Sequence, residues 1–482
     1  MSFWELENLR SAMSGSWLAR PGKHSPAEAQ GASIDTRTLK RGNIFFALKG
    51  EKVDGHRFLD AAARAGAALA VVEDSAVPSA APEGLALLQV DNVGRALLKC
   101  AGEYRKTLDG TRVISVGGSN GKTTTTRLIE AVLSRHFRGV SSPKSFNNAI
   151  GVPLTILSAR AGDQYLLCEV GTNATGEIAE LAGVAAPEIA VITSIGREHL
   201  EGLNSIRGVI AEEASIASGI RPGGVAIIAS NPPELADAVR GLLMGGKTGT
   251  IIRFGAEPDA DLRVESVSTD ELGTSFSINR RSKFRIPLLG AHNATNGAAA
   301  VAVARRFGLE DGAIQAALAD AASPEMRMRL EIKGPITLLN DAYNANPDSM
   351  LASLRAFADL ARHRNPARRV VVLADMLEMG EAGPDAHREI GDAVGADPSI
   401  DLAVLVGPLM MFAAERLRKK WTGERVMNLP RLDDEHARRI AAMLRPGDFV
   451  LLKGSRGMGV ERVAKALEGA SASVRPKQES AV

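Results

Sequence analysis

Short apolar runs alternate with helical patterns over most of the 482-residue chain. In the middle of the sequence these runs begin at Val113 and recur at residues 165–168, 189–192 and 225–228. Apolar runs of this length, separated by amphipathic stretches, are typical of βαβ units whose parallel strands are buried on both faces. The pattern predicts a central domain, residues 109–322, built on a mostly parallel sheet.

The pattern changes on both sides of this central region. Residues 1–108 mix short strands, such as 44–48, with an Ala-rich helix at 58–65, and predict a small α/β domain. Residues 323–470 contain a second series of apolar strands separated by helices, which predicts a third domain with its own doubly wound sheet. Its predicted strands are 336–339, 370–373, 402–406 and 449–452. The expected fold class is therefore α/β, with three domains.

Two segments depart from this alternation. Residues 248–290 are richer in Thr, Ser and alternating charge, which suggests antiparallel strands, and Ala-rich helices are expected at 293–307 and 311–321. The tail, residues 471–482, contains Ser, Lys, Pro and Gln and is expected to be disordered.

Composition and charge narrow the range of partners. The 58 basic and 56 acidic residues nearly cancel, so a nucleic acid partner is not expected. Cys100 and Cys168 lie among apolar residues and are interpreted as small core side chains. The N-terminus has no basic segment followed by an apolar one, and no run approaches the length of a membrane span. We expect a monomeric cytoplasmic protein without a membrane partner.

The most informative chemical signal is a Gly-rich turn that follows the run beginning at Val113. The turn consists of Gly118, Ser119, Asn120, Gly121, Lys122, Thr123 and Thr124. Glycines let backbone N–H groups converge on phosphate oxygens, Lys122 can reach the outer phosphates of a nucleotide, and Thr123 can ligate Mg²⁺. The spacing G-x-x-G-K-T-T is shorter than the common GxxxxGK[ST] form, and an amphipathic run supplies the helix that must follow. This turn predicts nucleotide binding.

Two further strands end in residues that suit metal binding. Glu169 directly follows the apolar run at 165–168, where ligands of open α/β sheets collect, and it is a candidate Mg²⁺ ligand. The alternative is that Glu169 caps a helix or pairs with a surface Lys. His199 follows the run at 189–192 and is a candidate ligand for a second metal ion, although a lone His is often structural.

Two Asn-containing segments are weaker candidates for nucleotide contacts. Asn147 and Asn148 precede a helix and suit phosphate or sugar recognition, although either could simply cap that helix. Asn296 could present its amide to an adenine edge, although Asn293 as a helix cap would need no ligand.

The order of these segments resembles the Mur ligases of peptidoglycan synthesis. The segments are GGSNGKTT, CEVGTN, REHLEG, GAHNATN, NDAYNANPDSM and LLKGSRGMG, with IDTRTLKRGNIFFALKGEKVDGH near the start. The resemblance extends from about residue 34 to 465. The DxYNANPxSM and DTRxLxxGxxFxALxGxxxDGH segments resemble the branch that joins D-alanyl-D-alanine to a UDP-N-acetylmuramoyl tripeptide.

This resemblance assigns expected roles to residues in all three domains. The N-terminal domain is expected to bind the UDP end of the substrate through Asp35, Thr36 and Arg37, with Lys49, Gly50, Asp54, Gly55 and His56 nearby. The central domain is expected to bind ATP and magnesium, with Asn147 and Asn296 beside the Gly-rich turn. In the Rossmann-like C-terminal domain, Asp341 is expected near the ribose, Tyr343, Asn344 and Asn346 at the domain junction, and Lys453, Ser455 and Arg456 near the substrate. Either Arg327 or Arg329 is expected to contact the nucleotide.

The resemblance also implies the chemistry. A carboxylate of the tripeptide would attack the γ-phosphorus of ATP to give an acyl phosphate, and the amine of D-Ala-D-Ala would then displace phosphate. Lys122 and two Mg²⁺ ions would offset the charge, one ion held by Thr123 and the triphosphate, the other by Glu169, His199 and the incoming carboxylate.

One position departs from the family pattern. Most Mur ligases carry a lysine that becomes a carbamate and supports the second magnesium, whereas an ungapped alignment places Glu213 there. The carboxylate of Glu213 is predicted to supply the same charge directly, so Glu213 is a candidate catalytic residue and metal ligand. The alternative is that Glu213 is a solvated helical acid.

Two other functions compete with this interpretation. One is a Mur-type ligase that adds a different amino acid, although the segment from Tyr343 to Pro347 argues against it. The other is a P-loop switch protein, which would not need a separate sheet domain on each side.

Overall fold

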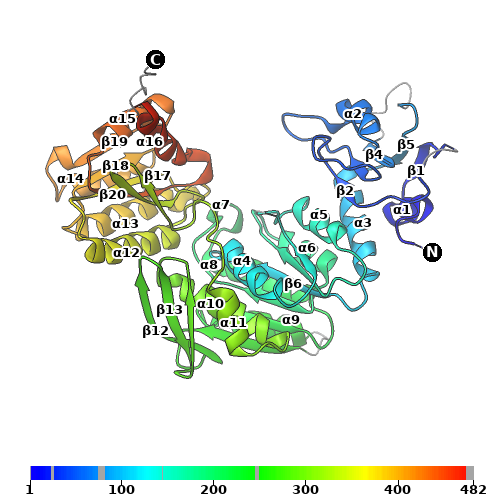
Figure 1. Cartoon of the computed structure of the whole chain (residues 1–482), viewed down its shortest axis with the longest axis horizontal. Helices are drawn as coiled ribbons and strands as arrows, with labels where there is room; N and C mark the ends of the chain where they lie inside the picture. Colours follow the sequence, from blue (N-terminus) through cyan, green and yellow to red (C-terminus); the bar gives the residue numbers. More distant parts are fainter. Residues whose placement is uncertain (1, 23–25, 74–81, 144, 245–248, 474–482) are drawn as a thin grey trace, which may run out of the picture.

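The computed structural model describes residues 2–22, 26–73, 82–143, 145–244 and 249–473. Three sheets of five, nine and six strands follow one another along the chain. In Figure 1 the nine-stranded sheet and its helices lie at the bottom, and the N-terminal and C-terminal domains rise from its two ends. The α/β class and the three-domain organisation are confirmed.

The N-terminal domain is built on the five-stranded sheet. In spatial order its strands are β1 (Ser16–Ala19), β5 (Ala86–Val90), β4 (Leu69–Glu73), β3 (Ile44–Phe46) and β2 (Ala32–Ser33). Its helices are α1 (Leu6–Met13), α2 (Leu59–Arg64) and α3 (Val93–Lys106). Only β1 runs antiparallel to its neighbour. The apolar side chains of this sheet pack on both faces, so the short runs noted in the sequence form a buried layer.

Helix α3 anchors this domain to the central one. The Tyr104 hydroxyl donates to the Ala159 carbonyl at 2.7 Å, and the buried Arg105 side chain donates to the Ala185 carbonyl at 2.8 Å and to Glu188 at 2.7 Å. The apolar core is continuous from α1 through α3 into the central sheet. Because α3 is buried against both domains, it joins the N-terminal domain to the central one.

The central domain contains the nine-stranded sheet. In spatial order its strands are β14 (Ser282–Ile286), β13 (Gly273–Ile278), β12 (Leu262–Asp270), β11 (Thr250–Gly255), β10 (Val225–Ala229), β9 (Ile189–Ile192), β6 (Arg112–Gly117), β8 (Tyr165–Glu169) and β7 (Gly139–Ser141). Its helices are α4 (Lys122–Leu133), α5 (Gly151–Ser158), α6 (Glu177–Ala185), α7 (Leu200–Leu203), α8 (Ile206–Ala214), α9 (Glu234–Met244), α10 (His292–Arg306) and α11 (Asp311–Leu318).

The register of the parallel strands brings the candidate residues to one edge of this sheet. Val116 of β6 pairs with Glu169 of β8, and Gly117 pairs with Ile192 of β9. The Gly-rich turn, Glu169 and the segment leading to His199 therefore leave the sheet side by side. The expectation of antiparallel strands over 248–290 is correct for β12 to β14 and wrong for β11, which extends the parallel part of the sheet.

The C-terminal domain has a six-stranded sheet with an apolar core on each face. In spatial order its strands are β15 (Arg329–Lys333), β16 (Ile336–Asp341), β20 (Asp448–Lys453), β17 (Arg368–Ala374), β18 (Leu402–Val406) and β19 (Val426–Leu429). Its helices are α12 (Pro347–Arg364), α13 (Gly383–Ala396), α14 (Met410–Arg418), α15 (Asp434–Met443) and α16 (Glu461–Ser473). The predicted strands all form, and β15 adds an antiparallel edge strand that the apolar pattern did not indicate.

Two smaller expectations can be compared with the structure. Cys100 and Cys168 are buried, and burial raises the pKa of each thiol to about 12. The tail was expected to be disordered from residue 471, but α16 continues through Ser473, and residues 474–482 lie outside the described part of the chain. In the described ranges, no helix combines the length and apolar character needed to cross a membrane.

Candidate active site

The Gly-rich turn has the backbone of a P-loop, the name used here for residues 118–124. Gly118 and Gly121 have φ values of 115° and 87°, and α4 begins immediately afterwards at Lys122. A Cβ on Gly118 would lie 2.3 Å from Thr193 Oγ1, and a Cβ on Gly121 would lie 2.3 Å from Asn296 Oδ1. Both positions therefore require glycine, and the loop presents the N-terminus of α4 to any bound anion.

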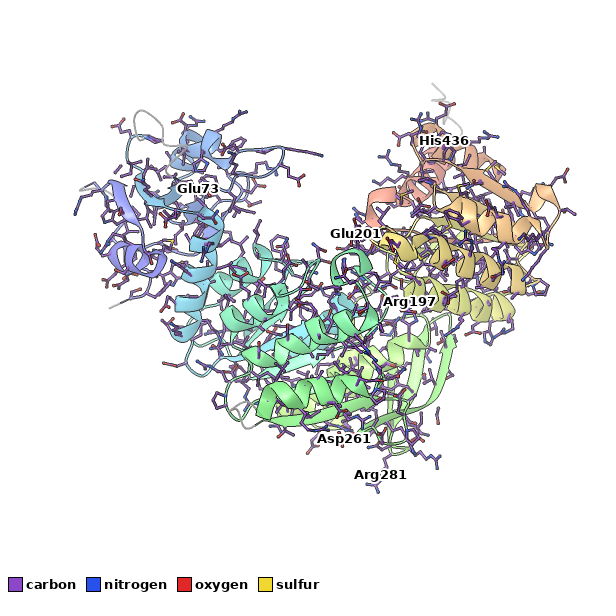
Figure 2. All side chains as sticks on the ribbon, turned by 180° about the vertical axis from the view of Figure 1, so that it is seen from behind. Glu73, Arg197, Glu201, Asp261, Arg281 and His436 are labelled. Carbon is purple, nitrogen blue, oxygen red and sulfur yellow. The ribbon has the colours of Figure 1, made fainter. Side chains whose placement is uncertain are left out.

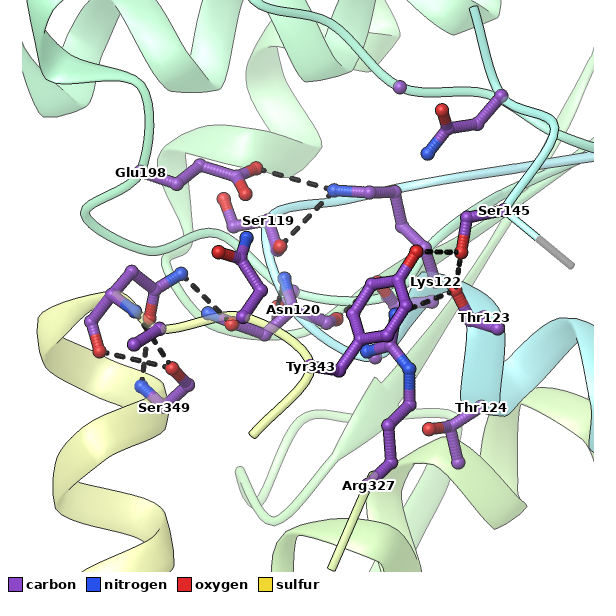
Figure 3. A pocket seen from close by; sticks show the side chains of 18 of the residues that line it. Ser119, Asn120, Lys122, Thr123, Thr124, Ser145, Glu198, Arg327, Tyr343 and Ser349 are labelled. Carbon is purple, nitrogen blue, oxygen red and sulfur yellow. Dashed lines mark hydrogen bonds and ion pairs between the residues drawn. The ribbon is translucent and has the colours of Figure 1, made fainter. Parts of the chain in front are cut away.

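Lys122 is folded back over the loop. Its ammonium donates to the carbonyl of Gly118, and to that of Ser119 at 3.2 Å, and lies 3.5 Å from Glu198 Oε1 (Figure 3). Burial lowers the pKa of Lys122, but the carboxylates of Glu198, Glu213 and Glu169 outweigh it, so the pKa is raised overall. Lys122 is therefore a cation surrounded by acids.

Glu169 ends β8 and is only 1% exposed. Its Oε1 accepts hydrogen bonds from Thr123 Oγ1 at 3.1 Å and Asn147 Nδ2 at 3.0 Å, whereas the buried Oε2 has no partner in the described structure. Burial raises the pKa of its carboxyl. Glu169 neither caps a helix nor pairs at the surface, so both alternatives raised from the sequence are wrong. Its unpartnered oxygen beside the Thr123 hydroxyl is a donor set that suits a hard cation.

His199 follows β9 and reaches the C-terminal domain. Its φ is 47°, and its Nδ1 lies 2.5 Å from Glu378 Oε2. Burial lowers the pKa of His199, and this effect outweighs the nearby carboxylate of Glu378, which would raise it. The ring is thus held by an acid from another domain rather than by the core.

Glu198 is a site residue that sequence reasoning missed. Its side chain is buried, faces Lys122 and lines the cavity, and burial raises its pKa to about 8. An acid next to a strand-end histidine was the available signal.

Glu213 lies beneath the P-loop and is fully buried on α8. Its Oε2 accepts the Gly118 N–H at 2.5 Å, its Oε1 has no partner among the described residues, and burial raises its pKa to about 7. The solvated-acid alternative is therefore wrong. Nor does Glu213 line the cavity with Glu169 and His199, because its two-methylene side chain ends under the loop. In this structure Glu213 therefore contacts the loop backbone, and its role as a metal ligand stays a prediction.

A cavity of about 940 Å³ lies over the P-loop, between the central and C-terminal domains. The P-loop from Ser119 to Thr124 lines it, together with the following predicted residues: Asn147, Glu169, His199, Asn296, Arg327, Asp341, Tyr343, Asn344, Asn346, Lys453, Ser455 and Arg456. Residues separated by up to about 340 positions in the sequence are thus gathered at one cavity, as Figure 3 shows for several of them.

The structure distinguishes the two candidate arginines. Arg327 Nη2 donates to Thr123 Oγ1 at 3.0 Å, and its guanidinium lies 4.0 Å from the centre of the Tyr343 ring. Arg329 is exposed at the start of β15 and does not line the cavity. Arg327 is therefore the arginine that reaches the P-loop.

The C-terminal domain bonds directly to the P-loop side of the cavity. The Tyr343 hydroxyl donates to Ser145 Oγ at 2.6 Å, and Asn346 Nδ2 donates to Asn120 Oδ1 at 2.9 Å (Figure 3). Asn346 also caps α12 through the N–H of Ser349, so the same residue begins that helix and contacts the loop.

Two residues that are expected near the substrate and line the cavity also have partners within the C-terminal domain. Lys453 is buried and donates to Asp341 Oδ2 at 2.5 Å and to the Asn344 carbonyl at 3.2 Å. Ser455 accepts the N–H of Leu377 at 2.9 Å. Both therefore support the cavity wall.

The asparagines of the two weaker candidate segments also have defined partners. Asn148 accepts the N–H of Gly151 at 3.0 Å at the start of α5, which is a capping contact, whereas Asn147 bonds Glu169. Asn293 lies within α10 and does not cap it; its Oδ1 accepts from Asn296 Nδ2 at 2.8 Å.

The predicted UDP-binding residues lie in the N-terminal domain and do not line this cavity. Arg37 Nη2 donates to Asp35 at 2.6 Å, and this contact lowers the pKa of Asp35 to about 2. His56 Nδ1 contacts Asp54 at 2.7 Å, and its Nε2 accepts the N–H of Glu73 at 3.0 Å, so both ring nitrogens are engaged. Lys49 forms a backbone bridge to Asp54. Figure 2 places Glu73 far from the junction marked by Arg197 and Glu201.

Comparison with known proteins identifies the class. Family models match the chain in three consecutive segments: "Mur ligase family, catalytic domain" over residues 28–105, "Mur ligase middle domain" over 116–304, and "Mur ligase, glutamate ligase domain" over 326–456. The chain belongs to the Mur ligase family.

Particular relatives narrow the comparison. A Bacillus subtilis protein named UDP-N-acetylmuramoyl-tripeptide--D-alanyl-D-alanine ligase is 36% identical over 96% of this chain and 98% of its own length. An Escherichia coli protein of the same name is 30% identical over 92% of this chain and 96% of its own length. The crystal structure of MurF from Acinetobacter baumannii superimposes with a TM-score of 0.83 and 27% identity, and covers 97% of this chain and 99% of that one.

Proposed function

We propose that this chain joins D-alanyl-D-alanine to a UDP-N-acetylmuramoyl tripeptide with consumption of ATP, a step of peptidoglycan precursor synthesis. The observation that carries the proposal is the full-length match to relatives that bear this name, in a chain whose motif residues line one cavity. The reaction needs a nucleotide site and two further substrate sites. The cavity between the central and C-terminal domains supplies the first.

The P-loop provides the phosphate-binding groups. The N–H groups at the N-terminus of α4 favour negative charge, and the Lys122 ammonium would leave the Gly118 and Ser119 carbonyls to reach a bound phosphate. Arg327 already contacts Thr123 and adds a second cation on the other side. These groups offset the charge that builds up when a carboxylate approaches the γ-phosphate.

One Mg²⁺ fits the residues present. The described residues contain no group of three or more His, Cys, Asp or Glu that could hold a metal unaided. Thr123 Oγ1 and the unpartnered Glu169 Oε2 would therefore hold the ion together with the nucleotide. When bound, the ion would neutralise phosphate charge and orient the γ-phosphate. The second ion expected near His199 stays a prediction, since His199 is paired with Glu378 and Glu213 lies below the loop.

The remaining cavity residues position the reactants and exclude water. Attack of the tripeptide carboxylate on the γ-phosphorus would give an acyl phosphate and ADP, and the amine of D-Ala-D-Ala would then form the amide and release phosphate. An acyl phosphate must be shielded from water. The contacts from Tyr343 to Ser145 and from Asn346 to Asn120 hold the C-terminal domain over the P-loop for this purpose.

The N-terminal domain is proposed to bind the UDP end, with Asp35, Thr36 and Arg37 as its polar contacts. The proposed location is the cytoplasm and the proposed state a monomer.

The proposal is tested with purified protein, ATP, Mg²⁺, D-Ala-D-Ala and two UDP-muramoyl tripeptides that differ in the third residue. We expect phosphate release only when both co-substrates are present, and a product whose mass equals tripeptide plus D-Ala-D-Ala minus water. Phosphate release that needs neither co-substrate would indicate a nucleotide switch and contradict the proposal. A product with a single amino acid in place of the dipeptide would indicate another ligase.

A further inference from the structure

The segment Gly196–His199 lies between the P-loop and the C-terminal domain. On the P-loop side, the Gly196 N–H donates to Ser119 Oγ at 2.8 Å, and the Ser119 N–H donates to the Ser194 carbonyl at 2.8 Å. Glu198 faces Lys122 on the same side. Any movement of this segment therefore moves groups that contact the P-loop.

On the other side, the Arg197 side chain donates hydrogen bonds to two helices of the C-terminal domain. Its Nη2 donates to Asp348 Oδ1 at 2.8 Å, its Nη1 donates to Glu389 Oε2 at 2.6 Å, and its own N–H donates to Asp348 Oδ2 at 2.7 Å. Asp348 lies in the first turn of α12, and Glu389 lies on α13. Figure 2 shows Arg197 where the two domains meet.

The backbone around Arg197 fits the docked domain closely. A Cβ on Gly196 would lie 2.7 Å from Asp348 Oδ2, so a larger residue there would displace that carboxylate from its present position beside the Arg197 N–H. Beyond it, Glu378 accepts the N–H of Glu201 through its carbonyl at 3.2 Å and contacts His199 through its carboxylate. Arg197, His199 and Glu201 thus each contact the C-terminal domain.

We propose that Arg197 is a positioning residue that couples docking of the C-terminal domain to the placement of Glu198 and His199 around Lys122. The inference deepens the proposed function and rests on it for its catalytic consequence, although the docking contact itself does not. A planar guanidinium with five donors can bridge two carboxylates, whereas an ammonium at the same place would hold one well. When Arg197 bridges Asp348 and Glu389, docking of α12 and α13 and ordering of the nucleotide site occur together.

The expected size of the effect is modest. The Arg197, Asp348 and Glu389 side chains are 36%, 39% and 41% exposed, so water and salt screen the pairs. We expect Arg197→Met to weaken ADP binding by about threefold to tenfold, a range that matches two screened ion pairs. The difference should shrink as the salt concentration rises.

Arg416 offers a matched control. It pairs with Asp392 at 2.7 Å, the two side chains are 41% and 39% exposed, and both lie within the C-terminal domain. Arg416→Met therefore removes an ion pair of the same kind and exposure without crossing the domain junction.

The experiment measures inter-domain distance and ADP affinity in the full chain. Spin labels at Arg281→Cys and Lys419→Cys report the distance between the central and C-terminal domains; both positions are exposed, and the native Cys100 and Cys168 are buried. We expect Arg197→Met to broaden the distance distribution towards longer values, Arg197→Lys to give an intermediate result, and Arg416→Met to leave it unchanged.

Three outcomes would overturn the proposal. They are an unchanged distance distribution in Arg197→Met with ADP affinity within twofold of the parent, an equal change in Arg416→Met, and a change that is the same at low and high salt. Because distance and ADP affinity need neither the tripeptide nor D-Ala-D-Ala, they stand apart from the ligase assay. If the parent protein forms no ligase product, but Arg197→Met still lengthens the inter-domain distance, the proposed function is rejected and the positioning role of Arg197 is not.

Discussion

The nucleotide end and the UDP end of this molecule are built in opposite ways. At the nucleotide end, side chains from two domains bond each other directly, as Arg327 does with Thr123 and Asn346 with Asn120. At the proposed UDP end, Arg37 bonds Asp35 and His56 bonds Asp54, each two positions away, and the Glu73 N–H donated to His56 is the more distant contact. The proposed nucleotide site is therefore assembled by contacts between domains, whereas at the proposed UDP site Arg37 would exchange its local contact with Asp35 for a substrate contact.

Loss of Lys122 should have the largest effect on the nucleotide end. Lys122→Ala removes the ammonium that is proposed to contact the phosphates, so we expect kcat to fall by about 10²–10³-fold, the range for loss of one strong electrostatic contact. Phosphate release in the complete assay measures it. Lys106→Ala serves as control, because Lys106 is exposed and, among the residues that the structure describes, pairs only with Glu103. A kcat within threefold of the parent would show that the P-loop is not where catalysis occurs.

Glu169 should control the requirement for magnesium. Glu169→Gln keeps the shape of the side chain but removes its charge, and we expect the Mg²⁺ concentration at half-maximal activity to rise by about 10–100-fold. The melting temperature should not fall, because burial already disfavours the charged form of Glu169. A magnesium titration at saturating ATP gives the answer, and an unchanged titration would remove Glu169 from the metal site.

Arg37→Ala should weaken binding of the UDP-muramoyl tripeptide without affecting binding of ADP. Its side chain is exposed and held only through Asp35, so Arg37→Ala is expected to raise the KM for the UDP-muramoyl tripeptide by about tenfold, equivalent to one charge-assisted hydrogen bond. ADP affinity, measured by calorimetry, should not change. A loss of ADP affinity would mean that the two ends are not independent.

The two ends should also respond to pH with opposite sign. Burial raises the pKa of Glu213 to about 7 and that of Glu198 to about 8, so the folded chain binds more protons than the unfolded chain above pH 4.5. The free energy of unfolding should therefore fall as pH rises from about 5 to 8. Asp35, whose pKa is lowered to about 2, contributes stability above its ordinary value of 3.8 that is lost as pH falls towards 2.

Thermal unfolding between pH 5 and 8 checks this smallest effect. Glu213→Gln retains an oxygen that can accept the Gly118 N–H and should flatten the decline, whereas Asp35→Asn should leave it unchanged. Equal slopes for the parent and Glu213→Gln would contradict the assignment.

The sequence pattern predicted which segments form the proposed nucleotide site, but not how each of its side chains is placed. Strand-end positions located the P-loop, Glu169 and His199, because parallel strands bring their carboxyl ends to one edge of a sheet. The depth of Glu213 could not be predicted, since it depends on how α8 packs under the loop. For the same reason Glu198, one position from His199, went unnoticed.

Other details depended on local geometry that the pattern does not encode. Arg327 and Arg329 flank the buried Met328, and the sequence pattern does not show that β15 begins at Arg329 and leaves Arg327 at the cavity. The edge strand β15 has alternating charge and no apolar run, so it resembled a connection. The partners of Lys453 and His56 are set by tertiary packing, which motif spacing does not report.

The most direct test of the central claim is a crystal structure of the chain with a non-hydrolysable ATP analogue and Mg²⁺. We expect the triphosphate on the N–H groups at the N-terminus of α4, Lys122 Nζ turned from the Gly118 carbonyl to a phosphate oxygen, and the metal beside Thr123 and Glu169. A triphosphate bound elsewhere, or Lys122 still on the Gly118 carbonyl with the analogue present, would contradict it.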